Sequence, residues 1–107
     1  MTPYILLEDH TPVPLKNSKE ELIMWVEWIS KFENVAVKQE EIGKYRISTV
    51  FLGLDHNWSR TGSPLLFETM IFKLDWTKEY QERCSTWDEA LIQHQNAIDY
   101  VKKLRME

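Results

Sequence analysis

Between residues 48 and 72, two apolar segments, STVFLGLDH and PLLFETMIF, flank a short polar loop and bring several ionisable residues close together. Asp55 and His56 end the first segment, and Glu68 lies within the second. Runs rich in Val, Ile, Phe and Thr with Gly and Pro between them are typical of paired strands, so we expect a β-hairpin. Because successive strand residues point to opposite faces, Asp55 and His56 are not expected to form one metal clamp.

The register of this hairpin decides whether two carboxylates meet. If Leu54 pairs with Phe67, Asp55 and Glu68 lie on the same face. A carboxylate pair of this kind could serve in acid/base chemistry or hold a hard cation such as Mg²⁺. The alternative is that both carboxylates are solvated or paired with Lys and Arg side chains.

The three histidines are the other candidate ligands. His94 interrupts an apolar helical stripe, so we expect its imidazole to face the sheet. With Glu68 and either His10 or His56, it could bind zinc or another transition metal, because neutral imidazole and carboxylate are suitable ligands. The alternative is a buried, hydrogen-bonded histidine. The enzyme hypothesis therefore uses Asp55, Glu68 and His94 as its catalytic group, and outside the metal version of it we expect no cofactor.

Cys84 precedes an expected helix, where the helix dipole could lower the thiol pKa and produce a nucleophile. The alternative is a small, semi-buried apolar residue. The sequence contains no P-loop, dinucleotide-binding glycine pattern, nucleophile elbow or CxxC pair. These absences lower the expectation of an enzyme.

The elements that must position these residues follow from periodicity and punctuation. The prolines of EDHTPVP are expected to end the first strand and to begin a loop. Capping-box spacings at Ser18 and Thr86 each predict the start of a helix. Strands are expected over residues 4–7, around the VAV segment, in the hairpin and over residues 78–84. Helices are expected over residues 19–32 and from residue 87 to the end. We predict one α+β domain over residues 1–107, with a single antiparallel sheet of four to five strands and two helices packed on it.

Composition narrows the classes of function. The chain has 107 residues, 43% apolar content and a formal net charge of −4, with a pI near 5.4. It offers no basic field for gripping phosphates, so we expect neither strong nucleic-acid binding nor membrane binding. A single cysteine, no secretory signal pattern and no run of about 18 apolar residues indicate a protein of a reducing cytoplasm.

Five tryptophans are many for so short a chain, and several lie off the expected core faces. Trp28 falls at the margin of the first helical stripe and Met24 lies off it, while Trp58 and Arg60 lie in the hairpin loop. Exposed Trp, Met and Arg are typical anchors of protein interfaces. These four residues are our candidates for partner contact; for Trp58, the alternative is that it folds back over the sheet.

Several segments together resemble a family of small uncharacterised proteins encoded by bacteriophages and prophages. The resemblance is carried by HTPVP at 10–14, STVFLGLDHN at 48–57, PLLFETMIF at 64–72 and STWDEA at 85–90. Similar proteins have a glycine-rich hairpin loop and a glycine pair after residue 72, both of which this chain lacks. The resemblance implies a phage or prophage accessory protein in the bacterial cytoplasm and brings no catalytic residues with it.

Three functional hypotheses result. The first is an accessory protein that binds a protein partner and modulates a host process, such as a defence system. The second is a small metal-dependent or acid/base enzyme, and the third is a minor virion component. A homodimer is compatible with the antiparallel sheet edges and spare aromatic residues, although no interface pattern specifies one.

Overall fold

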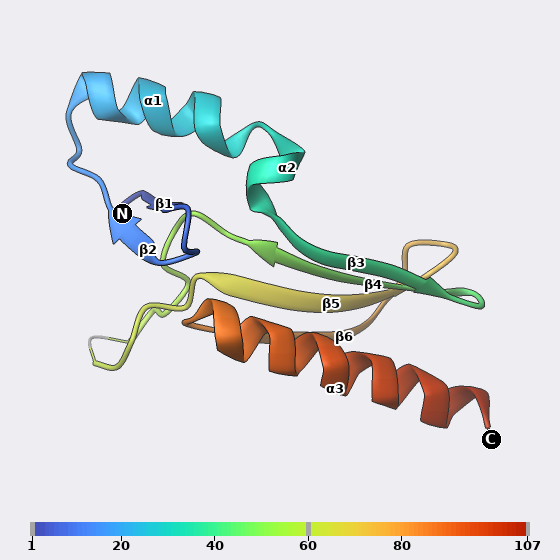
Figure 1. The fold of residues 1–107 in the computed structure, drawn as a ribbon. Coiled ribbons are helices and arrows are strands. Elements are labelled where there is room, and N and C mark those ends of the chain that lie inside the picture. Colours follow the sequence, from blue (N-terminus) through green and yellow to red (C-terminus); the bar gives the residue numbers. More distant parts are fainter. Residues whose placement is uncertain (1, 60, 107) are drawn as a thin grey trace.

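The fold is described by a computed structural model that covers residues 2–59 and 61–106 (Figure 1). In chain order its elements are β1 (Tyr4–Leu6), β2 (Pro12–Pro14), α1 (Lys19–Ile29), α2 (Phe32–Val35), β3 (Ala36–Ile42), β4 (Tyr45–Phe51), β5 (Phe67–Lys73), β6 (Lys78–Cys84) and α3 (Trp87–Arg105). Strands β3 to β6 form an antiparallel sheet in sequential order, and β1 pairs with β2 in a small second sheet. The predicted α+β class is therefore confirmed.

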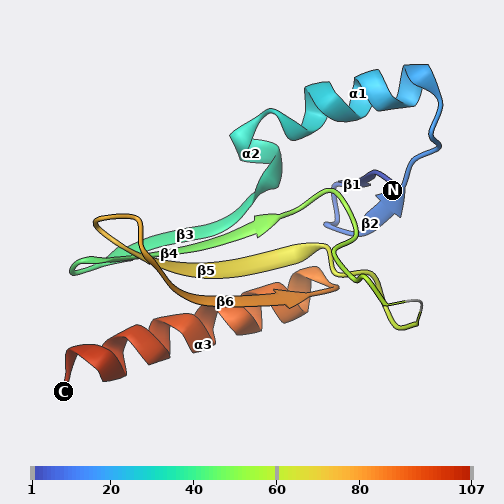
Figure 2. The ribbon, with the colours of Figure 1, turned by 180° about the vertical axis from the view of Figure 1, so that it is seen from behind.

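Helix α3 lies along one face of the four-stranded sheet, as the views from the front and from behind both show (Figures 1 and 2). The burial pattern of the strands explains this position of the helix. Along β4 burial alternates, and Tyr45, Ile47, Thr49 and Phe51 are all buried. Each of these residues pairs with a β5 residue, Phe51 with Phe67 and Ile47 with Ile71 among them. Alternation thus gives the sheet one apolar face, which the helix covers.

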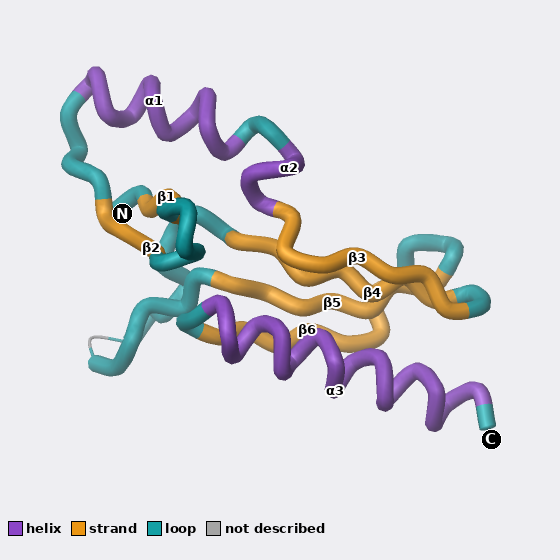
Figure 3. Tube along the Cα trace, viewed as in Figure 1, coloured by secondary structure: helices purple, strands orange, loops and turns teal. Residues whose placement is uncertain are grey.

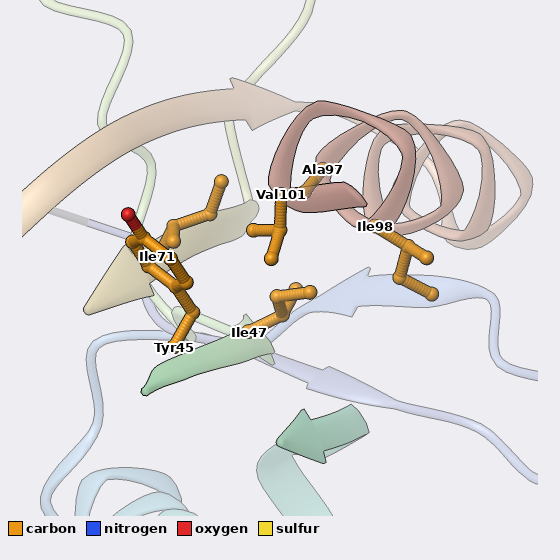
Figure 4. Close-up of a cluster of buried hydrophobic side chains, with 6 residues drawn as sticks. All are labelled: Tyr45, Ile47, Ile71, Ala97, Ile98 and Val101. Atoms are coloured by element: carbon orange, nitrogen blue, oxygen red, sulfur yellow. The ribbon is translucent and has the colours of Figure 1, made fainter. Parts of the chain in front are cut away.

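The main core cluster joins β4 and β5 to the last turns of α3. Its buried members are Tyr45, Ile47, Ile71, Ala97, Ile98 and Val101. Figure 4 shows the helix side chains lying over those of the two strands. A second cluster, nearer the start of α3, contains Phe51, Phe67 and Ala90. The apolar stripe of the predicted C-terminal helix is therefore the core-facing stripe.

Helix α3 begins where the sequence predicts. The Thr86 hydroxyl accepts a hydrogen bond from the backbone N–H of Glu89, and the Glu89 carboxylate accepts one from the Thr86 N–H. This reciprocal capping box satisfies two backbone donors that the first turn would otherwise leave unpaired. Lys102, Lys103 and Arg105 in the last turn complement the helix dipole.

The predicted helix over residues 19–32 is too long. Helix α1 ends at Ile29, and a separate short helix, α2, follows it (Figure 3). Seven of the eleven residues in α1 are apolar, yet none is buried. Its inner side contacts the N-terminal segment, where the Trp25 indole N–H donates to the Tyr4 carbonyl at 3.1 Å. The apolar pattern therefore predicts a helix, but it predicts neither the residue at which the helix ends nor how far its side chains are buried.

The loop predicted at the EDHTPVP prolines is only partly a loop, because β2 occupies Pro12–Pro14 and pairs with β1. Hydrogen bonds to the first strand are made at odd-numbered positions: Leu7 N–H donates to the Thr11 carbonyl, and Leu15 N–H to the Pro3 carbonyl. The even-numbered prolines lie between these bonds, where a missing N–H costs nothing. This is the edge-strand setting in which proline is tolerated.

Candidate functional site

The hairpin register differs from the one that would unite the two carboxylates. Phe51, not Leu54, pairs with Phe67, and Val50 pairs with Glu68. Strand β4 ends at Phe51, so Asp55 lies beyond the ladder, in the loop. Asp55 and Glu68 therefore do not share a strand face. The β4 strand begins three residues before the apolar segment used for the prediction and ends before Leu54 is reached.

Asp55 organises the backbone of the loop between β4 and β5. One oxygen of its carboxylate, Oδ1, accepts hydrogen bonds from the backbone N–H of Asn57 at 2.7 Å and from that of Leu65 at 2.8 Å. The Asn57 amide in turn donates to the carbonyls of Thr61 and Ser63, at 3.2 and 2.9 Å. Two short polar side chains thus tie the start of the loop to its end. Asp55 has a structural role here.

Trp58 stands on this braced loop with 72% of its surface exposed. It does not fold back over the sheet. A cleft of about 200 Å³ beside it is lined by side chains from the loop and from the N-terminal segment, namely Thr2, Tyr4, Asp55, Asn57 and Trp58. An exposed indole on a fixed backbone loses little conformational entropy when it contacts a partner. Arg60, the other predicted anchor of this loop, lies outside the described residues.

Glu68 lies on the face of the sheet that is turned away from α3. Only 6% of the residue is exposed, and its carboxylate Oε2 accepts hydrogen bonds from Arg83 Nε at 2.7 Å and Gln81 Nε2 at 2.6 Å. Both donors come from β6, whose Arg83 is the register partner of Glu68. The negative charge of the carboxylate is therefore balanced by Arg83, and the group is hydrogen-bonded across two neighbouring strands. This is the paired state expected of a buried charge.

His94 lies on the opposite side, fully buried between α3 and the sheet. Its Nδ1 is 2.7 Å from the Thr49 hydroxyl, which is 2.7 Å from the hydroxyl of Thr69. Its Nε2 is 3.4 Å from Glu40 Oε1, without the alignment of a hydrogen bond. Burial lowers the pKa of His94, and this outweighs the opposing effect of the Glu40 carboxylate. The expected sheet-facing imidazole is confirmed, and it belongs to a buried polar network.

His10 stacks on Trp87 at the start of α3. The two rings are nearly parallel, with centroids 3.6 Å apart. The His10 backbone has φ of +68°, a left-handed conformation that histidine adopts more readily than most residues. This conformation turns the imidazole of the β1–β2 loop onto the indole. Loop and helix, far apart in the sequence, are thereby joined.

A cleft of about 320 Å³ borders this stack. It lies where the β1–β2 loop, the end of α1, α2 and the start of α3 meet, and it is lined by Leu6, Leu7, Glu8, His10, Trp28, Glu33, Asn34, Ala36 and Trp87. These described lining residues combine indoles with carboxylates and include no Lys or Arg. Aromatic rings and carboxylates together suit a cationic group such as an ammonium or guanidinium. Sequence reasoning missed this cleft, because its walls come from several segments that lie far apart in the chain.

Trp28 and Met24, the two predicted anchors on α1, lie in different settings. Trp28 is half-buried, with its ring edge-on to Phe51 at 5.8 Å between centroids. It also lines the cleft beside the His10–Trp87 stack. Met24 is 45% exposed. The first is therefore mainly a packing residue with one side on a cleft, and the second is accessible to a partner.

The remaining candidate ligands are dispersed. His56 lies in the loop after β4, where its Nδ1 is 2.8 Å from the Leu54 carbonyl and its ring approaches Trp58 edge-on at 6.1 Å. His94 and Glu68 occupy opposite faces of the sheet, and His10 belongs to the N-terminal loop. Across residues 2–59 and 61–106, no three His, Cys, Asp or Glu side chains are grouped so that they could hold a metal ion.

Cys84 is buried at the end of β6, with 6% of its surface exposed. Burial is the main reason that the pKa of its thiol rises to about 11, and the nearby Glu89 carboxylate adds to the rise. The thiol is therefore protonated at neutral pH. The expected semi-buried apolar residue matches this setting, and an activated nucleophile does not.

No family model, curated protein or solved structure matches this chain. Within the described part of the chain, the helices are all too short or too polar to cross a membrane.

Proposed function

We propose that this chain is an accessory protein of the phage or prophage type, which acts in the bacterial cytoplasm by binding a protein partner. The contact is anchored by the loop between β4 and β5 that carries Trp58, here called the Trp58 loop. A host process, including a defence system, is the target that this setting favours. The sequence resemblance supports the setting, and the exposed loop supports the mode of action.

The observation that carries this proposal is the 72% exposure of Trp58 on a loop fixed by the side chains of Asp55 and Asn57. Burying a large apolar ring in a partner gains free energy, and the braced loop reduces the entropy that is lost on binding. Tryptophan is also among the residues most enriched at the energetic centres of interfaces.

The surrounding surface supports the same mode of action. The Trp58 loop, the β1–β2 hairpin and the start of α3 all lie at the end of the sheet that carries the N-terminus, in both ribbon views (Figures 1 and 2). The cleft bordered by His10, Trp28 and Trp87 belongs to this end and suits a cationic side chain. A partner with an apolar pocket for Trp58 and a nearby Lys or Arg fits these features.

The acid/base alternative has less support from the structure, because Asp55, Glu68 and His94 occupy three separate environments. Asp55 holds a loop, Glu68 pairs with Arg83, and His94 is fully buried. Catalysis by these groups needs them to meet at a substrate.

The proposal is tested by affinity capture of bacterial lysate proteins on the immobilised chain. We compare the wild type with Trp58→Ala and with the matched control Trp76→Asn. Trp76 is similarly exposed, at 67%, and lies at the far turn between β5 and β6 with φ of +65°, a conformation that asparagine tolerates.

The expected result is a specific protein that is retained by the wild type and by Trp76→Asn and is lost by Trp58→Ala. Capture that is equal for all three variants contradicts the role of the loop. Failure of the wild type to capture any specific protein from a host lysate contradicts the proposed mode of action.

A further inference from the structure

Helix α1 has an apolar outer stripe that the fold leaves uncovered. Its members Leu22, Ile23 and Val26 are 38%, 52% and 55% exposed, and with Asn17, Lys19 and Glu27 they line a shallow apolar depression on the surface. In both ribbon views α1 lies at the margin of the molecule (Figures 1 and 2). A helix that is apolar on two sides is normally buried on both.

The outer stripe is not needed to hold α1 in place. The opposite side of the helix supplies the internal contacts: Trp25 donates a hydrogen bond to the Tyr4 carbonyl, and Ile29 packs tightly over Gly53. The N-terminus of the helix is capped by Ser18, whose hydroxyl accepts from the Glu21 N–H. The apolar groups on the outer side are therefore available to another molecule.

Charges at the two ends of this stripe indicate what that molecule is. Lys19 and Glu27 each lie four residues from Ile23, one before it and one after it. With a rise of 1.5 Å per residue, each is about 6 Å from the centre of the stripe along the helix axis. A copy of the same helix running in the opposite direction places its Glu27 beside Lys19, and its Lys19 beside Glu27. The stripe is therefore complementary to itself.

We propose that the outer stripe of α1 binds the same stripe of a second copy of this chain, as an antiparallel helix pair about a two-fold axis at Ile23. The apolar side chains meet at the centre, and a Lys19–Glu27 ion pair forms at each end. A two-fold contact between identical patches is the commonest form of homodimer. This inference goes beyond the proposed function, because it concerns a surface separate from the Trp58 loop.

The size of the stripe sets the strength of the dimer. An eleven-residue helix is about 16 Å long. A pair of such helices buries less than the roughly 1,200 Å² typical of stable complexes, so the association is weak and depends on concentration. A dimer carries two Trp58 loops, so a partner with two binding sites is held more tightly by the dimer than by a single copy.

The proposal is tested by sedimentation equilibrium over about 1 to 300 µM protein, a range suited to a micromolar dissociation constant. We expect the average mass to rise from 12.8 kDa toward twice that value. Ile23→Glu remains monomeric at every concentration. The control Ile92→Glu, at an α3 position that is 62% exposed, associates like the wild type.

A charge exchange tests the antiparallel geometry independently of any change in folding. Lys19→Glu places like charges at both ends and weakens association by at least about 5-fold, and adding Glu27→Lys to the same chain restores most of the loss. A wild type that stays monomeric throughout overturns the proposal. An Ile23→Glu variant that dimerises normally, or a charge exchange that restores nothing, overturns it as well.

Discussion

His94 and Glu68 are buried on opposite faces of the same sheet, and each is contacted by side chains that lie far from it in the sequence. Periodicity correctly placed His94 toward the sheet, because one helical stripe faces one side. It could not supply Thr49, which lies 45 residues away and contacts the imidazole. The pairing of Glu68 with Arg83 likewise depends on the register of β5 against β6.

The lowered pKa of His94 predicts a specific loss of stability in acid. The folded protein binds a proton less readily than the unfolded chain, whose histidine has a pKa near 6.5. The contribution of His94 to the free energy of unfolding is therefore fully present above pH 6.5. It is lost as the pH falls from 6.5 toward the folded-state pKa of this histidine. The slope in this window is at most about 1.4 kcal/mol per pH unit. Glu40 and Lys38 also act on this imidazole, in opposite directions.

Urea unfolding of the wild type and of His94→Gln at several pH values measures this effect. The wild type should lose more stability than the variant between pH 6.5 and 5. His10 and His56 remain in both proteins, so the difference in slope belongs to position 94. Parallel pH profiles for the two proteins would show that the buried imidazole makes no contribution.

The Glu68–Arg83 pair predicts unequal effects from its two partners. Arg83→Met leaves a buried carboxylate without its cation, and we expect a loss of about 1–3 kcal/mol of unfolding free energy, because Arg83 is itself one-third exposed. Glu68→Gln keeps an oxygen that accepts hydrogen bonds, so its loss should be smaller. Chemical denaturation of both variants checks this order. Equal losses, or a larger one for Glu68→Gln, would contradict it.

Among the elements, α1 shows most clearly where local pattern and tertiary contact differ. Its capping residue Ser18 and its start at Lys19 could be predicted, because caps act within one turn. Its end could not, because the break before α2 has no Gly or Pro to announce it. The same holds for the hairpin. Its two strands and loop could be predicted from local pattern, but its register could not, because register depends on pairing along the whole ladder.

The contact between α1 and the segment just after β4 requires glycine at position 53. Its φ is +78°, and a Cβ placed there would lie 2.1 Å from Ile29 Cδ1. Gly53→Ala should therefore destabilise the protein by about 1–3 kcal/mol, from backbone strain and from displacement of α1. Urea unfolding gives the size, and amide hydrogen exchange in α1 shows where the loss falls.

A double-mutant cycle separates these two causes. Combining Gly53→Ala with Ile29→Ala removes the clash but keeps the strained φ, so the double variant should lose less stability than the sum of the single variants. Additive losses would show that Ile29 does not press on this glycine.

At the scale of the whole molecule, the α+β class and the order of most elements could be predicted, because hydrophobic periodicity and helix caps are local signals. The aromatic cleft could not, because His10, Trp28 and Trp87 are brought together only by the packing of separate elements. The sequence predicts Trp58 as a candidate for partner contact, because polar residues surround it in the loop. The exposed Trp58 and the aromatic cleft thus lie at one end of the sheet, while the predicted catalytic residues are dispersed over the molecule.

Whether Trp58 anchors a protein partner is measured most directly by the dissociation constant of the captured partner for the wild type and for Trp58→Ala, determined by titration calorimetry. We predict at least about 30-fold weaker binding for Trp58→Ala, the loss expected of an interface hot spot, with Trp76→Asn unchanged. A change of less than about 3-fold for Trp58→Ala would contradict the anchoring role of this side chain.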